Sequence, residues 1–176
     1  KWIKQNQELI LTELTKDFGK CREELMISEI KPVISDINDA LRNLRFWAQD
    51  THKTTPLALL GTKAKVVKEP KGNTLIIAPW NFPFMLAMGP LVSAIAAGCT
   101  AVVKPSENTP HCERLIEKLI KEVFKPEEVA CVKGGVAETT HLLDLKWDHI
   151  FFTGSPVVGK IVMTAAAKHL TSVTLE

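Results

Sequence analysis

Polar residues stand directly after two short apolar runs, where a sheet would present them to a ligand. Asn81 follows the run 75–77, and Lys104 and Glu107 follow the run 100–103. A rigidly held carboxamide can stabilise a developing oxyanion, and a lysine or glutamate at a strand end can hydrogen-bond a ribose hydroxyl. By position alone, the simpler interpretation is that Asn81 forms a turn or caps a helix and that Lys104 and Glu107 form an exposed ion pair.

Two glycine-containing turns could receive phosphate or nucleotide groups. Gly154 and Ser155 end an apolar run and open a helix-length segment, with Gly159 in its first turn. Backbone N–H groups there could face a phosphate, assisted by the helix dipole. The spacing is GxxxxG and not GxGxxG, so the glycines alone are weak evidence and could simply allow a tight turn. Gly134 and Gly135 form a second such turn, which could approach an adenine or be structural.

The thiols and imidazoles show no pattern that predicts a metal site or a disulfide framework. The four cysteines lack CxxC spacing and are interpreted as buried structural thiols of a reducing, intracellular and cytoplasmic setting. The five histidines lack metal-ligand spacing, so no metal is assigned. The cysteines are Cys21, Cys99, Cys112 and Cys131.

Composition and charge exclude several classes of protein. A hydrophobic fraction of 45% argues against disorder, and a net charge of +2 with interspersed acids argues against nucleic-acid binding. The longest apolar run, 82–98, is broken by prolines and is shorter than the roughly 20 residues of a membrane span. The absence of tyrosine rules out a tyrosine-dependent short-chain dehydrogenase. The chain also lacks the GxxxxGK[ST] motif, which rules out a P-loop ATPase.

From residue 72 onward, strand-like and helix-like segments alternate. Short apolar runs separated by helix-length segments predict an α/β fold with a doubly wound parallel, Rossmann-like sheet. The carboxyl ends of its strands should bring Asn81, Lys104 and Gly154 to one edge. The predicted strands cover residues 74–78, 100–103, 129–132, 148–152 and 172–175, and the predicted helices cover 84–97, 111–123, 136–143 and 156–168.

The first part of the chain predicts helices followed by an edge strand. Apolar spacing predicts a helix over 7–18 ended by Gly19, then a long helix to Trp47 with a kink or restart at Pro32. Residues 51–60 are predicted to be polar at first and then turn-like, and 64–68 to form an edge strand. We therefore divide the chain into a helical segment (1–56), an edge strand and linker (57–71) and a dinucleotide-binding domain (72–176).

Five ordered motifs carry a resemblance to a known family. PWNFP at 79–83, AIAAGCT at 94–100, KPSE at 104–107, FTGSPVVG at 152–159 and the terminal TLE resemble the aldehyde dehydrogenase superfamily. The run VGKIVMTAAAKHLTSVTLE most resembles the class 3 and fatty aldehyde dehydrogenases. The resemblance implies NAD(P)-dependent oxidation of medium or long-chain aliphatic aldehydes to carboxylic acids, through a cysteine thiohemiacetal and thioester. It also implies a homodimer whose subunits contact each other through a β-arm.

The resemblance also implies a role for each matching residue. Asn81 would donate to the thiohemiacetal oxygen, and Glu176 would activate the water that hydrolyses the thioester. Glu107 would repel a 2′-phosphate, which favours NAD while leaving NADP possible. The FTGS stretch, residues 152–155, and Gly159 would contact the pyrophosphate. The implied cofactor-binding residues are Pro79, Trp80, Lys104, Ser106, Glu107, Gly134, Gly135, Phe152, Thr153, Gly154, Ser155 and Gly159.

The family's nucleophilic cysteine lies beyond its glutamate motif, and none of the four cysteines here replaces it. We therefore expect a nucleotide-binding portion truncated at both ends, inactive as 176 residues alone, with no membrane span of its own. Membrane attachment through other parts of a parent protein stays open. The alternative is a non-catalytic module on the same fold that binds a nucleotide or a partner.

Overall fold

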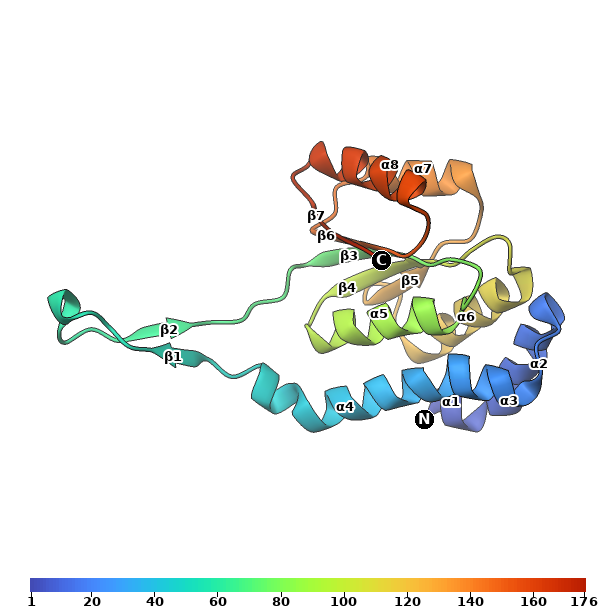
Figure 1. Cartoon of the computed structure of the whole chain (residues 1–176), viewed down its shortest axis with the longest axis horizontal. Coiled ribbons are helices and arrows are strands. Elements are labelled where there is room, and N and C mark those ends of the chain that lie inside the picture. The colour runs from blue at the N-terminus through green and yellow to red at the C-terminus, as the bar shows by residue number, and fades with distance from the viewer.

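A computed structural model describes all residues, 1–176, and its centre is a five-stranded parallel sheet (Figure 1). The strand order β5-β4-β3-β6-β7 places the first strand of the unit in the middle. The chain first builds outward on one side and then on the other, as in a doubly wound fold. The strands are β3 (Asn73–Ile77), β4 (Thr100–Lys104), β5 (Val129–Cys131), β6 (His149–Phe152) and β7 (Ser172–Leu175).

Helices cover both faces of this sheet (Figure 1). Helices α5 (Met85–Ala96) and α6 (Pro110–Val123) lie on one face, and α7 (Val136–Asp144) and α8 (Pro156–Ala167) lie on the other. Each predicted strand and helix of this region is present, with ends within one residue of the prediction. The predicted α/β class and parallel topology are therefore confirmed.

Alternating side chains of the central strand separate two hydrophobic clusters. Leu75 and Ile77 point into the cluster under α7 and α8, while Ile76 and Ala78 point into the larger cluster under α5 and α6. This follows from the period of two along a strand. Because both faces are covered, β3 is apolar at three consecutive positions, Leu75, Ile76 and Ile77.

The N-terminal helices pack outside α5 and α6 and contribute to the larger cluster. Gly19 ends α2 in the left-handed conformation (φ 65°), as its position predicted. The long helix is interrupted by a π-helical turn just before Pro32, which lacks the N–H that would bond the Ser28 carbonyl. The elements are α1 (Trp2–Gln5), α2 (Gln7–Phe18), α3 (Arg22–Leu25), η1 (Met26–Ile30) and α4 (Lys31–Trp47).

A β-hairpin extends away from the body of the molecule (Figure 1). Strands β1 (Thr51–Lys53) and β2 (Ala64–Val66) pair antiparallel, with the short helix η2 (Leu57–Leu59) at the tip. The prediction of a polar and then turn-like stretch over 51–60 did not include β1, whose three residues are polar but form a strand. Their sequence, ThrHisLys, is polar and exposed. The strand conformation therefore depends on pairing with β2, and there is no apolar alternation to detect.

Candidate functional site

The carboxyl ends of the strands lie side by side. Ile77 is level with Lys104 on one side and with Phe152 on the other, and Phe152 is level with Leu175. The residues that follow these strand ends therefore share one edge of the sheet. The structure thus brings together the stretches after β3, β4, β5, β6 and β7, including Asn81, Ser106, Gly135, Gly154 and Glu176. This common edge was predicted, and it lies where open α/β sheets bind ligands.

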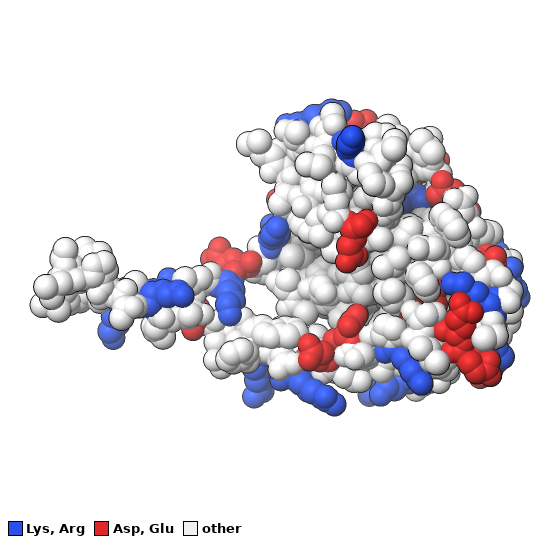
Figure 2. All heavy atoms as spheres, viewed as in Figure 1, with Lys and Arg blue, Asp and Glu red and all other residues white.

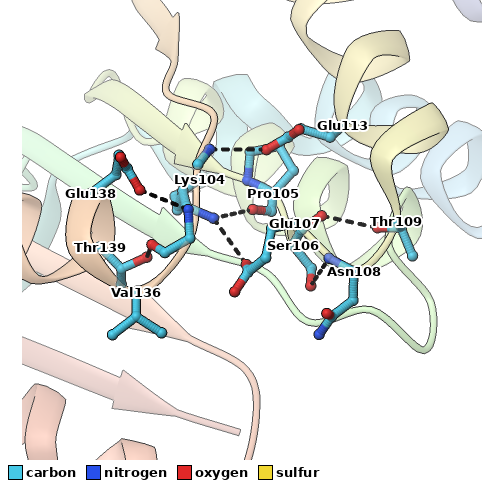
Figure 3. A network of polar contacts seen from close by, with 12 residues as sticks. Lys104, Pro105, Ser106, Glu107, Asn108, Thr109, Glu113, Val136, Glu138 and Thr139 are labelled. Carbon is cyan, nitrogen blue, oxygen red and sulfur yellow. Dashed lines mark hydrogen bonds and ion pairs between the residues drawn. The ribbon is translucent and has the colours of Figure 1, made fainter.

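Lys104 and Glu107 differ sharply in exposure. The Lys104 side chain is 2% exposed, whereas that of Glu107 is 45% exposed. Lys104 Nζ donates to the Pro105 carbonyl at 2.5 Å and lies 3.4 Å from Glu107 Oε2 (Figure 3). The simpler interpretation, an ion pair exposed on both sides, is therefore wrong. The buried ammonium holds the 104–107 turn together and leaves the Glu107 carboxylate partly available to a ligand.

The two-glycine turn after β5 lies against Glu107 and is fastened by two carboxylates (Figure 3). A Cβ at Gly135 would lie 3.7 Å from Glu107 Oε1. Glu113 Oε1 accepts the Gly134 N–H at 3.1 Å, and Glu138 Oε2 accepts the Gly135 N–H at 2.8 Å. Hydrogen bonds from backbone N–H groups lower the pKa of Glu138. Neither glutamate was predicted, although a glutamate three residues after Gly135 has the spacing of a helix-capping residue.

Thr153, Gly154 and Glu176 are joined across β6 and β7. Gly154 N–H donates to the Glu176 carbonyl at 3.1 Å, and Glu176 N–H donates to the Phe152 carbonyl at 3.0 Å. Thr153 Oγ1 lies 3.5 Å from Glu176 Oε2. The Glu176 carboxylate is exposed, so water reaches it. Phe152, in contrast, buries its ring in the core and offers only its backbone to this edge.

The glycines near α8 allow close packing. A Cβ on Gly154 would lie 2.5 Å from Phe152 Cζ, and one on Gly159 would lie 3.4 Å from Leu175 Cδ1. The Gly159 N–H already donates to the Ser155 carbonyl at 2.9 Å, and Ser155 Oγ accepts from Val158 at the start of the helix. These residues bring the N-terminus of α8 close to the sheet edge.

Asn81 lies in an exposed turn that residues of the N-terminal segment contact at both ends. Lys20 Nζ donates to the Asn81 carbonyl at 3.0 Å and lies 4.3 Å from the centre of the Phe82 ring. Glu29 Oε2 accepts the Met85 N–H at 2.8 Å. Burial raises the pKa of Glu29 to about 7. Neither Lys20 nor Glu29 was predicted, because they lie more than fifty positions away in the chain.

Each cysteine lacks either the thiolate character or the position that a nucleophile at this edge requires. Complete burial raises the pKa of Cys112 far above its usual range, and burial raises that of Cys131 to about 12. Cys99 precedes β4 and therefore lies at the opposite edge, and Cys21 is exposed between α2 and α3. No group of three or more histidine, cysteine or acidic side chains could hold a metal ion.

The surface charge is mixed, and the helices do not have the character of membrane spans. Figure 2 shows lysine and arginine interspersed with aspartate and glutamate on this face of the molecule. No helix combines the length and the apolar composition needed to cross a bilayer.

The whole chain matches a known family model. The model described as "Aldehyde dehydrogenase family" matches residues 1–176. Aldehyde dehydrogenase family 3 member B1 of Bos taurus is 46% identical over the entire chain, which covers 38% of that protein. The 4,4'-diaponeurosporen-aldehyde dehydrogenase of Staphylococcus aureus is also 46% identical, again over the entire chain and 38% of its own length. The chain thus spans little more than a third of these relatives.

Solved structures show the same fold. The substrate-bound state of Staphylococcus aureus AldH is 45% identical and superimposes with a TM-score of 0.97, covering 99% of this chain and 38% of that one. A Mycobacterium tuberculosis aldehyde dehydrogenase complexed with NAD+ is 26% identical, with a TM-score of 0.88 over 99% of this chain and 36% of that one.

Proposed function

The chain belongs to the aldehyde dehydrogenase family, and from this premise we propose that it is the nucleotide-binding portion of an NAD(P)-dependent enzyme that oxidises aldehydes to carboxylic acids. The observation that carries the proposal is the shared edge of the sheet. There, the family-matching residue Lys104 ends β4, and Asn81, Gly154 and Glu176 follow the neighbouring strands β3, β6 and β7.

In the proposed reaction, a cysteine thiolate from another part of the longer enzyme adds to the aldehyde carbon. The Asn81 side-chain amide donates a hydrogen bond to the oxyanion formed in this addition. When bound, NAD(P)+ would supply the acceptor for the hydride of the aldehyde carbon, and loss of that hydride would convert the thiohemiacetal to a thioester on the cysteine. Glu176 accepts a proton from the water that hydrolyses this thioester, so aldehyde, NAD+ and water give acid, NADH and a proton.

The residues at the sheet edge fit a dinucleotide. Glu107 is partly exposed just after β4, where its carboxylate can accept a hydrogen bond from a ribose hydroxyl. The buried Lys104 ammonium holds the turn through the Pro105 carbonyl. The N-terminus of α8, with Thr153, Gly154, Ser155 and Gly159, would face the pyrophosphate, and Gly134 and Gly135 would flank the adenine side. Pro79, Trp80, Ser106 and the Phe152 backbone would complete the binding surface. The Mycobacterium relative is a complex with NAD+.

The substrate proposal rests on the relatives. We propose medium or long-chain aliphatic aldehydes, because the motifs resemble the class 3 and fatty aldehyde dehydrogenases and the relatives include family 3 members. We further propose a homodimer that uses the exposed leucines of the arm, Leu57 and Leu60, and an intracellular location suited to four free cysteines.

A charge-neutral substitution at Glu107 tests the cofactor proposal. In the full-length enzyme, Glu107→Gln should lower kcat/KM for NAD about tenfold and change kcat/KM for NADP by less than about threefold, because the carboxylate accepts from the ribose and repels a 2′-phosphate. The measurement is steady-state kinetics with both cofactors and a fixed aldehyde. Glu127→Gln is the matched control, because Glu127 is exposed and lies just before β5, at the opposite edge of the sheet. Unchanged NAD kinetics would refute the role of Glu107.

A non-catalytic module is the second candidate, because no cysteine of this chain suits catalysis. Both candidates predict NAD binding, so turnover by the full-length protein distinguishes them. Absence of aldehyde oxidation by correctly folded, NAD-binding protein would favour the module.

A further inference from the structure

The turn that carries Asn81 is held from outside the sheet. Lys20, which follows α2, reaches across to donate to the Asn81 backbone carbonyl at 3.0 Å. Its ammonium lies 4.3 Å from the Phe82 ring centre and 4.8 Å from the Phe18 ring centre. An ammonium held against two aromatic rings has fewer positions available to it, so the hydrogen bond has a defined direction.

The other end of the same turn is held by Glu29. This carboxyl group is completely buried, and its Oε2 accepts the N–H of Met85, the first residue of α5, at 2.8 Å. Its other oxygen, Oε1, has no hydrogen-bond partner in the protein. Burying an incompletely paired carboxyl group costs stability, and an apolar side chain would pack here without that cost. The contact with the start of α5 is therefore the interaction that the carboxyl group provides.

We propose that Lys20 and Glu29 are positioning residues that fix the orientation of the Asn81 side chain for oxyanion stabilisation. This inference rests on the proposed function of Asn81. One residue holds the backbone at Asn81 itself, and the other holds it four positions later, with only Phe82, Pro83 and Phe84 between the two contacts. An oxyanion donor is effective only when it is already aimed at the developing charge, and a shift of about 1 Å can cost a large part of the rate.

Kinetics of the full-length enzyme test the role of Lys20. Lys20→Met should lower kcat on the order of tenfold and leave KM for NAD within about twofold, because the transition-state contact is lost while cofactor binding is kept. Lys20→Arg, which keeps a cationic donor, should retain most of kcat. Lys16→Met is the matched control, since Lys16 pairs with Glu13 on the surface of α2, away from the turn.

A double-mutant cycle separates positioning from a general structural effect. In an Asn81→Ala background, Lys20→Met should lower kcat by less than about twofold, because the group that it positions is already absent. Equal losses in both backgrounds would overturn the proposal. So would an unchanged kcat in Lys20→Met.

Substitutions of Glu29 give an independent test. Glu29→Ala should lower kcat per titrated active site, and Glu29→Gln should restore most of it, because the amide oxygen can still accept the Met85 N–H. A lower folded fraction with unchanged kcat per active site would overturn the role of Glu29.

Hydrogen exchange of the 176-residue protein checks the contacts without any activity. The Met85 amide should exchange faster in Glu29→Ala than in the wild type, and Lys16→Met should leave it unchanged. Unchanged exchange at Met85 in Glu29→Ala would overturn the inference.

If the exchange result holds but the wild-type enzyme oxidises no aldehyde, the proposed function fails. If the enzyme is active and the cycle is additive, only the positioning inference fails.

Discussion

Among single residues, Glu29 is the one whose ionisation should change stability most clearly. Burial raises its pKa from the ordinary 4.5 to about 7, against the opposing effects of the Met85 N–H and Lys20. The Glu29 charge in turn contributes to raising the pKa of the buried thiol of Cys112. Between these two pH values, the folded protein holds a proton that the unfolded chain releases. Stability therefore falls as the pH rises through this window.

Replacing Glu29 with glutamine should remove this pH dependence. We expect Glu29→Gln to be about 2–3 kcal/mol more stable than the wild type at pH 8, and the difference to disappear near pH 4.5, where both side chains are neutral. The measurement is urea unfolding of both proteins at several pH values between 4.5 and 8. A difference that stays constant across the range would show that Glu29 is not buried as a carboxyl group with a raised pKa. A stabilising change at a positioning residue is compatible with function, because such sites often sacrifice stability.

At the scale of elements, helix α6 receives its N-terminal cap from another helix. Asp17, near the end of α2, accepts the His111 N–H at 3.1 Å through Oδ1 and the Cys112 N–H at 2.8 Å through Oδ2. Thr109, the residue just before α6, makes no capping hydrogen bond with its own side chain. The carboxylate thus satisfies two free N–H groups of α6 and joins the outer helical layer to the sheet domain.

Removing this cap should destabilise the protein measurably. Asp17→Ala should lower the free energy of unfolding by about 1–2 kcal/mol, because two N–H groups lose their acceptor. Asp17→Asn, which keeps one acceptor oxygen, should lose less. Asp39→Ala on the exposed face of α4 is the control and should change stability by less than about 0.5 kcal/mol. Equal effects of Asp17→Ala and Asp39→Ala in chemical unfolding would contradict the capping role.

At the scale of the whole molecule, the arrangement of thiols leads us to expect NAD binding without turnover. The 176-residue protein, incubated with NAD and an aliphatic aldehyde, should give no sustained rise in absorbance from reduced cofactor. Covalent oxidation requires a thiolate at the carboxyl edge of the sheet. Cys131 lies closest to that edge, but with a pKa of about 12 only on the order of one thiol in 10⁵ is ionised at pH 7. Sustained turnover that disappears in Cys131→Ala or Cys99→Ala would contradict this expectation.

The sequence by itself determined the parallel sheet and the residues that lie along its edge. Apolar runs, helix-length spacers and the glycine that ends α2 are local features, and their meaning does not depend on a distant partner. Once strands alternate with crossover helices, the chain leaves every strand at the same edge. For this reason the sequence alone places Asn81, Lys104 and Gly154 at one edge of the sheet.

Only the tertiary structure decided which residues support that edge. Lys20 meets Asn81 across 61 positions, Glu29 meets Met85 across 56, and Asp17 meets His111 across 94. These contacts arise from the way the outer helices lie on α5 and α6. The position of a single lysine or glutamate in the sequence does not predict which residue it will contact. The same reason explains the burial of Lys104 and the pairing of β1 with β2, since exposure and strand pairing are properties of neighbours in space and not of neighbours in the chain.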